Sequence, residues 1–541
     1  MVRAEEFTYD LVVVGAGING LGIARDAAER GLSVALVEQY DLCAGVSAWS
    51  GRLVHGGLRY LERGDIRLVR ESLRERELLF RVAPHLVKPV RLIMPFYARN
   101  TRPPWMIRLG MLAYDVLSAD KSVAWHRILS ASAVKNRFVG MTDSGLSGAA
   151  IFTDGQVEYA ERLCAELAVA AADAGARIHT HTQAVGMLRD GARVTGVRVR
   201  TSRGEERTIS ARITVNAAGP WVDEVLAGES ESDAVRSPRL IGGAKGSHIV
   251  VDPFPGAPKD VVYYESQSDG RLVLVIPWMG RYLIGCTDIK YDLDPDSARA
   301  DSTEVDYLLA EANTLMPDAN LTIDDVLYTY SGVRPLPYAP DVPEWRVPRS
   351  HIIRDHAKDG EPGILSAVGG KLTTYRQLAE DATDIVVKML KARAPKKPIS
   401  KYQPFPGART ADLAAAQKSF LTNETLDPDT SRRLWGLYGT RAQRVLELAQ
   451  ANPELVERFD PESAAIAAEL IFAVSEEFAE TLTDVFARRI LLAFNPGHGL
   501  AGAERAAEIL ASRLGWSDQE RAAEVAEYRE WLDHLRVPER V

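Results

Sequence analysis

The sequence predicts an α/β protein in three parts: a domain built around a parallel sheet, a β-rich second domain and an all-helical C-terminal domain. Three observations predict it. Residues 10–38 read as strand, turn, helix and strand, residues 240–290 are rich in strand signals, and residues 410–541 carry only helical patterns. Because the chain has 541 residues, more than one hydrophobic core usually organises, two or three domains are expected.

The first 38 residues contain one complete βαβ unit. The run LVVV at 11–14 has the continuous apolar pattern of a strand that is buried on both faces. Residues 18–30 are amphipathic and end before Gly31, which is typical of a helix closed by a glycine. SVALVE at 33–38 is a second strand, so two parallel strands and their crossover helix are expected.

Helices and strands alternate less regularly further along the chain. Helical spacing predicts helices over 66–82 and 158–175, the second of which is followed by a strand near 177–182. The segments RLVLVIPW and RYLIGCTD flank Met279 and Gly280, which is a strong hairpin signal.

The last helix before the C-terminal region is expected from Lys371 to about Lys391. Thr374 and Gln377 have the spacing of a capping box near its start. The segment 391–407, KARAPKKPISKYQPFPG, is basic and rich in proline, which indicates a linker. The sequence beyond it shows helical patterns that end at Gly or Pro, and no strand signal.

Composition places the chain among soluble globular enzymes, with 46% apolar and 26% charged residues. The formal net charge of -9 argues against nucleic acid as a partner, because a nucleic-acid surface needs clustered excess Lys and Arg. Cys43, Cys164 and Cys286 lie far apart in the sequence, so neither a disulfide framework nor a metal site is expected, which suits a reducing cytosol. No signal peptide or membrane span is visible, so any membrane contact must be at the surface.

The loop after the first strand, VVGAGINGL, has the form GxGxxG with Gly15, Gly17 and Gly20. These glycines allow a tight turn, the close approach of a pyrophosphate and close packing of helix on strand. The helix N-terminus then faces the phosphates with its partial positive charge. Glu38 ends the second strand, where a carboxylate accepts hydrogen bonds from a ribose 2′-hydroxyl and rejects a 2′-phosphate, so NADP is not expected.

The glycine motif alone fits NAD or FAD. An NAD domain normally continues as one block of alternating strands and helices. In this chain an arginine-rich segment follows the βαβ unit instead, and the strand that ends in NAAGPW comes only at 216–221. Such a discontinuous nucleotide domain favours FAD. The small residues Ala217, Ala218 and Gly219 would let the backbone pass close to the dinucleotide, and a tight strand exit is the alternative.

Five further segments carry a specific resemblance. In chain order they are RLVHGGLRYLERGDIRLVRESLRERELL (52–79), KGSHIVVD (245–252), VIPWMGRYLIGCTD (275–288), YSGVRPL (330–336) and GGKLTTYRQLAEDA (369–382). Together with ARRILLAF in the helical tail, they resemble the FAD-dependent glycerol-3-phosphate dehydrogenases over essentially the whole chain.

The resemblance implies a Rossmann-like FAD-binding domain of glutathione-reductase type in a flavoenzyme that oxidises sn-glycerol 3-phosphate to dihydroxyacetone phosphate. Hydride would pass from C2 to FAD N5, and the electrons would then pass to a membrane quinone. The FAD-binding domain is expected to be discontinuous, over 1–85, 150–235 and 330–400. The substrate-binding domain is expected over 86–149 and 236–329, and the helical C-terminal domain over 401–541.

Matching motif positions imply the site residues. The implied catalytic residues are His55, Arg59, Tyr60, His248, Arg334 and Lys371. The expected cofactor-binding residues are Gly15, Gly17, Asn19, Gly20, Glu38, Gln39, Ser47, Ser50, Arg52, Val185, Ala218, Gly219, Trp221, Asp288, Gly370, Lys371, Leu372 and Thr373.

One segment departs from the family pattern. Before the HGG block the family has small and hydroxyl residues ending in Lys, whereas this chain reads VSAWSGR, with Trp49, Gly51 and Arg52. Ser47 and Ser50 could keep flavin contacts.

A substrate phosphate carries about two negative charges near pH 7, so a dry site must supply cations. Arg59, Arg334 and Lys371 suit this role. Loss of the hydroxyl proton needs a base near neutral pKa, and His55 or His248 could serve. His55 is favoured because it lies four residues before Arg59 in one motif. Lys371 could instead face the reduced flavin, and the sequence does not separate the two roles.

Other functions stay open on the sequence alone. A glycerol-3-phosphate oxidase would use oxygen, a related FAD amine or amino-acid oxidase would take a carboxylate-bearing amine, and a non-enzyme would hold FAD structurally. Residues 103–117, PPWMIRLGMLAYDVL, have the composition of an interfacial helix, so a cytoplasmic protein attached peripherally to the inner face of the cell membrane is expected. A homodimer and the role of the helical tail stay open.

Overall fold

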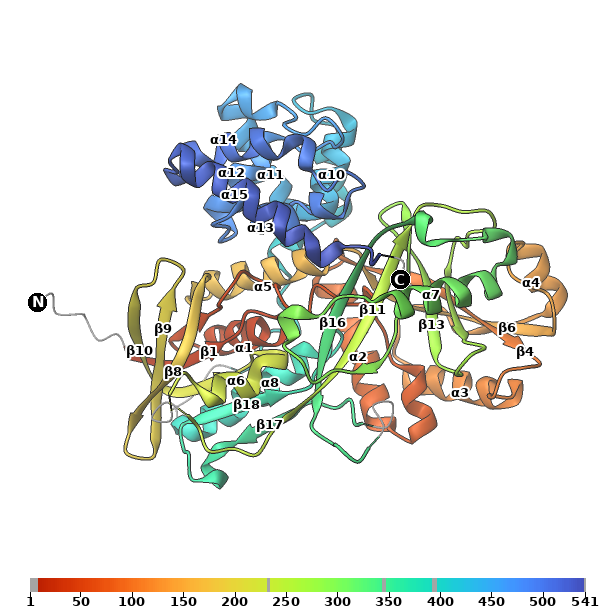
Figure 1. Cartoon of the computed structure of the whole chain (residues 1–541), viewed down its shortest axis with the longest axis horizontal. Coiled ribbons are helices and arrows are strands. Elements are labelled where there is room, and N and C mark those ends of the chain that lie inside the picture. The colour runs from red at the N-terminus through yellow and green to blue at the C-terminus, as the bar shows by residue number, and fades with distance from the viewer. Residues whose placement is uncertain (1–7, 231–233, 343–346, 392–396, 540–541) are drawn as a thin grey trace, which may run out of the picture.

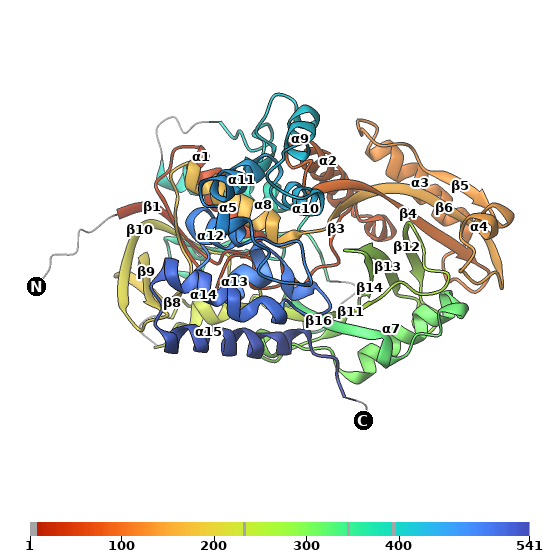
Figure 2. The same ribbon diagram turned by 90° about the horizontal axis from the view of Figure 1, so that it is seen from above.

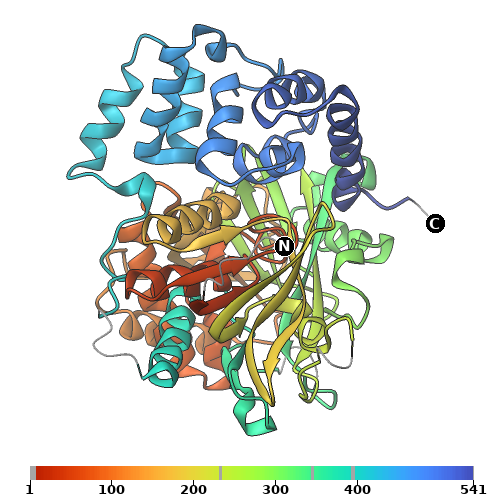
Figure 3. The same ribbon diagram turned by 90° about the vertical axis from the view of Figure 1, so that its left-hand side faces the viewer.

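The computed structural model describes residues 8–230, 234–342, 347–391 and 397–539, without the side chains of Thr8, Arg59 and Arg63. Two β-sheets form the body of the molecule, and a layer of helices from the C-terminal part lies above them (Figure 1). Seen end on, the helical layer and the sheets stay distinct (Figure 3).

Sheet A, the first sheet, has a parallel centre in the order β7, β2, β1, β10 and β18. An antiparallel strand, β17, closes one edge, and β8 and β9 form an antiparallel extension of β10. The strands are β1 (Thr8–Val14), β2 (Val34–Val37), β7 (Arg177–His179), β8 (Thr182–Asp190), β9 (Arg193–Thr201), β10 (Glu206–Asn216), β17 (Ile352–Asp355) and β18 (Ile364–Val368).

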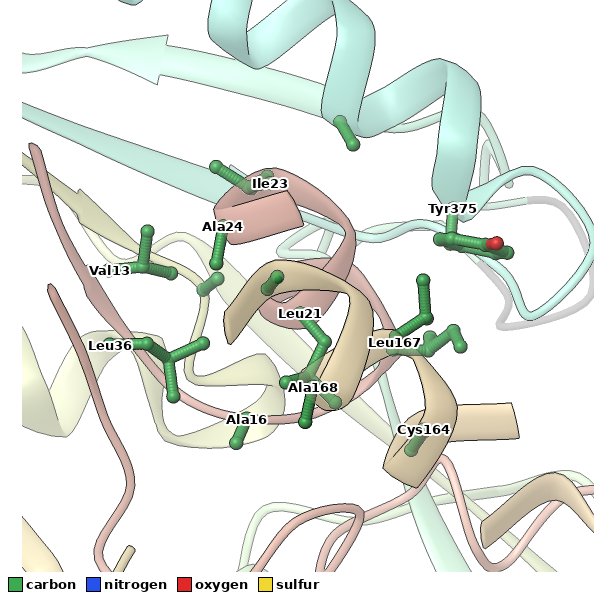
Figure 4. Packing of buried hydrophobic residues seen from close by; sticks show 14 of the residues in the cluster. Val13, Ala16, Leu21, Ile23, Ala24, Leu36, Cys164, Leu167, Ala168 and Tyr375 are labelled. Atoms are coloured by element: carbon green, nitrogen blue, oxygen red, sulfur yellow. The ribbon is translucent and has the colours of Figure 1, made fainter. Parts of the chain in front are cut away.

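The apolar run of β1 is explained by burial on both faces of sheet A. Leu11 and Val13 pack into one apolar cluster, and Val12 and Val14 pack into another that includes residues of β8 and β9. Helices α1 (Ile18–Glu29), α5 (Ala160–Asp173) and α8 (Tyr375–Leu390) cover the Leu11 face (Figure 4). The predicted βαβ unit is therefore confirmed, and segments from three distant parts of the chain complete its core.

Sheet B, the second sheet, runs in the order β15, β11, β14, β13, β12, β4, β6 and β3, with β16 paired to β11 and β5 paired to β6. Its strands are β3 (Leu53–Val54), β4 (Val87–Tyr97), β5 (Arg127–Ser130), β6 (Leu146–Val157), β11 (Ile241–Val251), β12 (Val261–Glu265), β13 (Leu272–Trp278), β14 (Arg281–Gly285), β15 (Ile289–Lys290) and β16 (Val326–Pro337).

Helices cover both faces of sheet B. Leu92 of β4 packs with α2 (Ile66–Val82) and α3 (Pro104–Leu117), while the next residue, Ile93, packs with α4 (Ala131–Arg137) and α7 (Ser302–Leu315). The predicted hairpin is confirmed, because Trp278 pairs with Arg281 across Met279 and Gly280. Both turn residues have positive φ, 49° and 76°, as a two-residue primed turn requires.

The C-terminal part is helical, as predicted. Its helices are α9 (Leu413–Leu421), α10 (Pro428–Tyr438), α11 (Ala442–Ala451), α12 (Ala467–Glu476), α13 (Leu482–Asp484), α14 (Ala503–Leu514) and α15 (Asp518–Trp531). Over residues 397–539 the backbone pairs in β fashion only at a single bridge between Arg458 and Ile466. The domain lies over α5 of the sheet A domain and reaches β16 of sheet B (Figure 2).

Two expectations differ from the structure. Thr374 is the N-cap of α8, but no capping box forms, because its φ and ψ of -109° and 12° lie outside the extended region that a capping side chain needs. Gln377 instead donates to Asp381 one turn later. The expected third FAD-domain segment begins at residue 330, whereas β16 runs to Pro337 and pairs with β11 in sheet B.

A short helix, α6 (Val222–Ala227), follows β10. Among the described residues, no helix combines the length and the apolar character needed to cross a membrane.

Candidate active site

A cavity of about 400 Å³ is lined by residues of both sheets. On the side of sheet A it follows the carboxyl ends of β1, β2, β10 and β18, which is where ligands bind in parallel α/β sheets. The expected cofactor residues that line it are Gly15, Gly17, Asn19, Glu38, Gln39, Ser47, Ser50, Ala218, Gly219, Trp221, Asp288, Gly370, Lys371, Leu372 and Thr373. The lining also includes the expected catalytic residues His55, Tyr60, His248 and Arg334.

Two of the loop glycines, Gly15 and Gly20, have no room for a side chain. A Cβ atom on Gly15 would lie 2.8 Å from the Ala217 carbonyl oxygen, and its φ of +103° disfavours other residues. A Cβ atom on Gly20 would lie 1.9 Å from the Gly15 carbonyl, so Gly20 serves the packing of α1 on the loop and does not line the cavity. The Ile18 amide, at the start of α1, donates to Ser47 Oγ at 3.0 Å.

Glu38 lies at the end of β2 with its carboxylate fixed by the backbone. Its Oε2 accepts from the Ala16 amide at 2.7 Å and its Oε1 from the Tyr40 amide at 3.0 Å. Burial raises the pKa of Glu38, and the two amide bonds oppose that shift. Each carboxylate oxygen can accept a further hydrogen bond, so Glu38 can still bind the hydroxyls of a ribose.

The opposite end of the cavity is rich in cations. Asp288 bridges two arginines: its Oδ1 lies 3.0 Å from Arg334 Nη1, and its Oδ2 lies 3.2 Å from Arg349 Nη2. Cys286 Sγ lies 2.8 Å from Arg334 Nη2. A Cβ atom on Gly246 would lie 2.1 Å from the same nitrogen, so the guanidinium crosses β11 at a glycine. Both arginines are thus held on the cavity wall by Asp288.

Lys371 lies in the GGK loop before α8. Its Nζ is 3.7 Å from the centre of the Tyr60 ring, and the pKa of Lys371 is lowered, mainly by burial. Asn19 of α1 donates to the Gly369 carbonyl at 3.2 Å, so the first and last cavity loops are bonded to each other. Lys371 therefore occupies a fixed place between the glycine loop and the Tyr60 segment.

His248 is on β11 and 3% exposed. Burial lowers its pKa to about 3, and the charges of Arg334 and Arg52 act in the same direction. Its Nδ1 makes no hydrogen bond within the described part of the chain. The imidazole is thus neutral near pH 7, and His248 lines the cavity.

His55 follows β3 and begins the turn into the short helix Leu58–Arg63. Its amide donates to Thr373 Oγ1 at 3.2 Å, and the Gly56 amide donates to the Tyr114 hydroxyl at 2.9 Å. Tyr114 in turn donates to Asp154 at 2.8 Å. Three distant segments therefore fix this turn. The side chain of Arg59, which the sequence predicts at the substrate phosphate, lies outside the described residues.

Arg52 and Val185 do not line the cavity. The Arg52 side chain is fully buried, pairs with Glu161 at 2.6 Å and lies over the Trp278 ring at 4.9 Å. The distant Glu161 binds this cation, and no local pattern reveals that. Val185 is buried in β8, next to Ala184, which does line the cavity.

Cys286 and Arg349 are among the cavity residues that the sequence analysis did not assign to the site. Cys286 lies in the RYLIGCTD segment of the predicted hairpin, and this position could have identified it as a cavity residue. Arg349 lies in a loop without a motif. Trp49, where the sequence departs from the family, lines the cavity and packs against Trp531 and His534 of the helical domain at ring distances of 6.0 and 6.2 Å.

The parallel sheet, its glycine loop and the acid after β2 define a dinucleotide-dependent enzyme, and the second sheet supplies further residues of the cavity wall. The model for FAD dependent oxidoreductases matches residues 10–376, and that for the C-terminal domain of alpha-glycerophosphate oxidase matches residues 399–521. The chain belongs to the FAD-dependent oxidoreductase family, so its cofactor is FAD.

Curated relatives and solved structures agree with this family. A glycerol-3-phosphate dehydrogenase of Synechocystis is 43% identical, with 98% of this chain and 97% of that protein covered. A D-erythritol 1-phosphate dehydrogenase of Brucella abortus is 38% identical, with 90% and 95% covered. The structure of the Bacillus halodurans glycerol-3-phosphate dehydrogenase complexed with FAD is 28% identical, covers 99% of this chain and 97% of that chain, and has a TM-score of 0.81.

The residues present fit FAD. Glu38 offers an acceptor for a ribose, the N-terminus of α1 offers its partial positive charge for a pyrophosphate, and Gly15 puts no side chain in between. Lys371 lies further along the cavity, where a cation can face the isoalloxazine. The cavity therefore has an acceptor, an anion site and a cation for the three parts of the cofactor.

Proposed function

We propose that this protein oxidises sn-glycerol 3-phosphate to dihydroxyacetone phosphate. The observation that carries the proposal is the pair of arginines, Arg334 and Arg349, held by Asp288 on the wall of a cavity that the neutral His248 also lines. The names of the 43% identical relative and of the Bacillus halodurans structure support this substrate.

The arginines bind the phosphate group. A phosphate dianion loses its hydration in a buried site, so it needs bidentate donors that keep their charge. Arg334 meets this need, since its neighbours Cys286 and Asp288 raise its pKa against the effect of burial. We assign Arg334 and Arg349 to the phosphate, with Arg59 as the third cation expected from the motif.

His248 accepts the proton of the C2 hydroxyl. We assign it this role, ahead of His55, because its imidazole lines the cavity and is held in the neutral form, which can accept a proton. Its low pKa reflects burial and the positive charge of Arg334 and Arg52. A bound dianion offsets that charge and raises the pKa toward a range useful for proton transfer. When bound, FAD supplies the two-electron acceptor for the hydrogen that leaves C2.

Lys371 and Tyr60 close the remaining side of the site. The cation lies against the aromatic face, which holds it while its desolvation lowers its pKa. We assign Lys371 to the flavin, where it would offset negative charge on FAD, because it lies in the loop four residues before α8, whose N-terminus adds a partial positive charge.

Helix α3 is the proposed contact with the membrane, where a quinone accepts the electrons. Trp105, Leu109, Leu112 and Val116 are 49% to 66% exposed and recur at helical spacing along one face. The opposite face, with Met111 and Tyr114, is buried against the protein. An exposed Trp among aliphatic side chains is typical of a helix lying in a lipid interface, and we place this face on the cytoplasmic side of the cell membrane.

An anaerobic titration tests the proposed function. Addition of sn-glycerol 3-phosphate should bleach the visible absorbance of the bound flavin, whereas glycerol or an amino acid should leave it unchanged. Reoxidation by a soluble quinone should be faster than reoxidation by oxygen, which separates a dehydrogenase from an oxidase. Bleaching by D-erythritol 1-phosphate alone would contradict the proposed substrate.

A further inference from the structure

The helical domain holds the segment that carries Glu38. Asp41 lies three residues after Glu38 and is fully buried. Its Oδ2 accepts from Arg488 Nε at 2.6 Å and from Arg489 Nη1 at 2.8 Å, and its Oδ1 accepts from Arg489 Nη2 at 2.6 Å. Both arginines belong to the ARRILLAF segment of the helical domain. One carboxylate at the cofactor end is thus bound by two cations from another domain.

A second contact holds the neighbouring chain segment. The connection between β7 and β8 bonds to the Glu38 segment, because the Thr182 amide donates to the Glu38 carbonyl and the His181 amide to the Tyr40 carbonyl, both at 2.7 Å. His181 Nε2 lies 2.8 Å from Asp484 Oδ2 of the helical domain. The helical domain therefore holds both the turn after β2 and the segment that is bonded to it.

The same turn is bonded to the glycine loop. The Cys43 amide donates to the Ala16 carbonyl at 3.0 Å, and the Ala16 amide donates to the Glu38 carboxylate at 2.7 Å. A movement of Asp41 would shift both partners of Ala16. Because a buried carboxylate that loses its cations is strongly destabilised, removal of the arginines would force this turn to rearrange toward water.

We propose that Arg488 and Arg489 are positioning residues for FAD. By holding Asp41, they keep the turn from Glu38 to Asp41 in the geometry that presents the Glu38 carboxylate to the cofactor ribose. The helical domain is then part of the cofactor site. This inference rests on the assignment of Glu38 to the ribose and does not depend on the identity of the substrate.

If Arg489 only joined the two domains, its substitution would lower stability and leave FAD release unchanged. Arg162 of α5 is also fully buried and also binds the helical domain, with its Nη2 2.7 Å from Glu477 Oε1. It does not line the cavity and makes no bond to the Glu38 turn among the described residues. Arg162 and Arg489 therefore form a matched pair: both join the two domains, and only Arg489 reaches the turn.

The test measures FAD release from the holoenzyme by the rise in flavin fluorescence after dilution, together with the thermal midpoint with and without added FAD. Arg489→Met should release FAD about tenfold faster or more, as expected for losing charge-assisted hydrogen bonds. Excess FAD should restore much of its thermal midpoint. Arg162→Met should lower the midpoint while FAD release stays as in the wild type.

Two further variants keep the outcome decisive. Arg488→Gln leaves the Arg489 pair in place and should release FAD faster by a smaller factor, even where Arg489→Met fails to fold. Glu38→Gln tests the assignment of the ribose ligand.

Wild-type FAD release in Arg488→Gln, with faster release in Glu38→Gln, overturns the role of the arginines. Wild-type FAD release in Glu38→Gln overturns the assignment of Glu38 to the cofactor ribose. Failure of glycerol 3-phosphate to bleach the flavin affects neither result.

Discussion

The two ends of the cavity are built in different ways. The ribose end is made by neighbouring residues of one βαβ unit, Gly15 to Glu38, and most of its donors are backbone amides. The cation end is made by side chains from distant segments, such as Tyr60, Arg334 and Lys371. The comparison teaches that the first end depends on backbone geometry and the second on charge, so different substitutions should break each.

Gly15→Val should have the largest effect at the ribose end. The added side chain meets the Ala217 carbonyl at a backbone conformation that valine avoids, so the loop must move away from the cofactor. We expect purified protein without flavin, measured as the ratio of flavin to protein absorbance. Gly31→Val is the control, because a Cβ atom on Gly31 meets nothing within 4 Å while its φ is also positive, +90°. Full flavin content in Gly15→Val would contradict the tight loop.

His248→Asn should cause the largest loss of catalysis with FAD still bound. Removal of a general base typically costs about 10²- to 10⁴-fold in rate, so kcat should fall in that range. His55→Asn is the matched comparison and should cost less. A kcat within a factor of about two of the wild type in His248→Asn, with a large loss in His55→Asn, would return the base to His55.

The pH dependence follows from the sign of the His248 shift. Its pKa is about 3 without substrate, so His248 stays unprotonated, and able to accept a proton, until the pH falls well below its ordinary range. The acid limb of kcat/KM should therefore show no ionisation of this group near pH 6.5. Because the bound dianion raises the pKa of His248, kcat should begin to fall on the acid side at a higher pH than kcat/KM does. Identical acid limbs for the two parameters would contradict this.

Arg334→Ala should break the cation end alone. Its loss removes charge-assisted hydrogen bonds worth about 1.5–3 kcal/mol each, so kcat/KM should fall on the order of 100-fold, largely through KM. FAD content should stay as in the wild type. Arg239→Ala is a useful control, since Arg239 pairs with Asp292 and does not line the cavity. Unchanged saturation by glycerol 3-phosphate would remove Arg334 from the phosphate site.

Leu109→Glu should have the smallest effect on catalysis. This side chain is 59% exposed on α3, so folding and anaerobic bleaching should be unaffected. Binding to anionic vesicles, measured by sedimentation, should weaken about tenfold, because burying a leucine is worth about 1.5–3 kcal/mol. Val139→Glu, at an 83% exposed site off this helix, should bind as the wild type does. Equal binding by all three proteins would exclude α3 as the contact.

The ribose end could be predicted from residues close together in sequence. The run LVVV, the glycine spacing and Glu38 lie within one motif, and the Met279 turn was marked by its flanking strands. The cation end could be predicted only through resemblance, because its members meet across two sheets. Arg52 shows the limit: the distant Glu161 binds it, and no pattern of spacing reveals that. Arg349 was missed because a loop without periodicity carries no signal.

A crystal structure of the holoenzyme with sn-glycerol 3-phosphate bound under anaerobic conditions would test the central claim most directly. The account predicts the phosphate within hydrogen-bond distance of the Arg334 and Arg349 guanidinium groups, and the C2 hydroxyl against the His248 imidazole. A phosphate bound elsewhere, with Arg334 still turned to Asp288 and His248 away from the ligand, would contradict it.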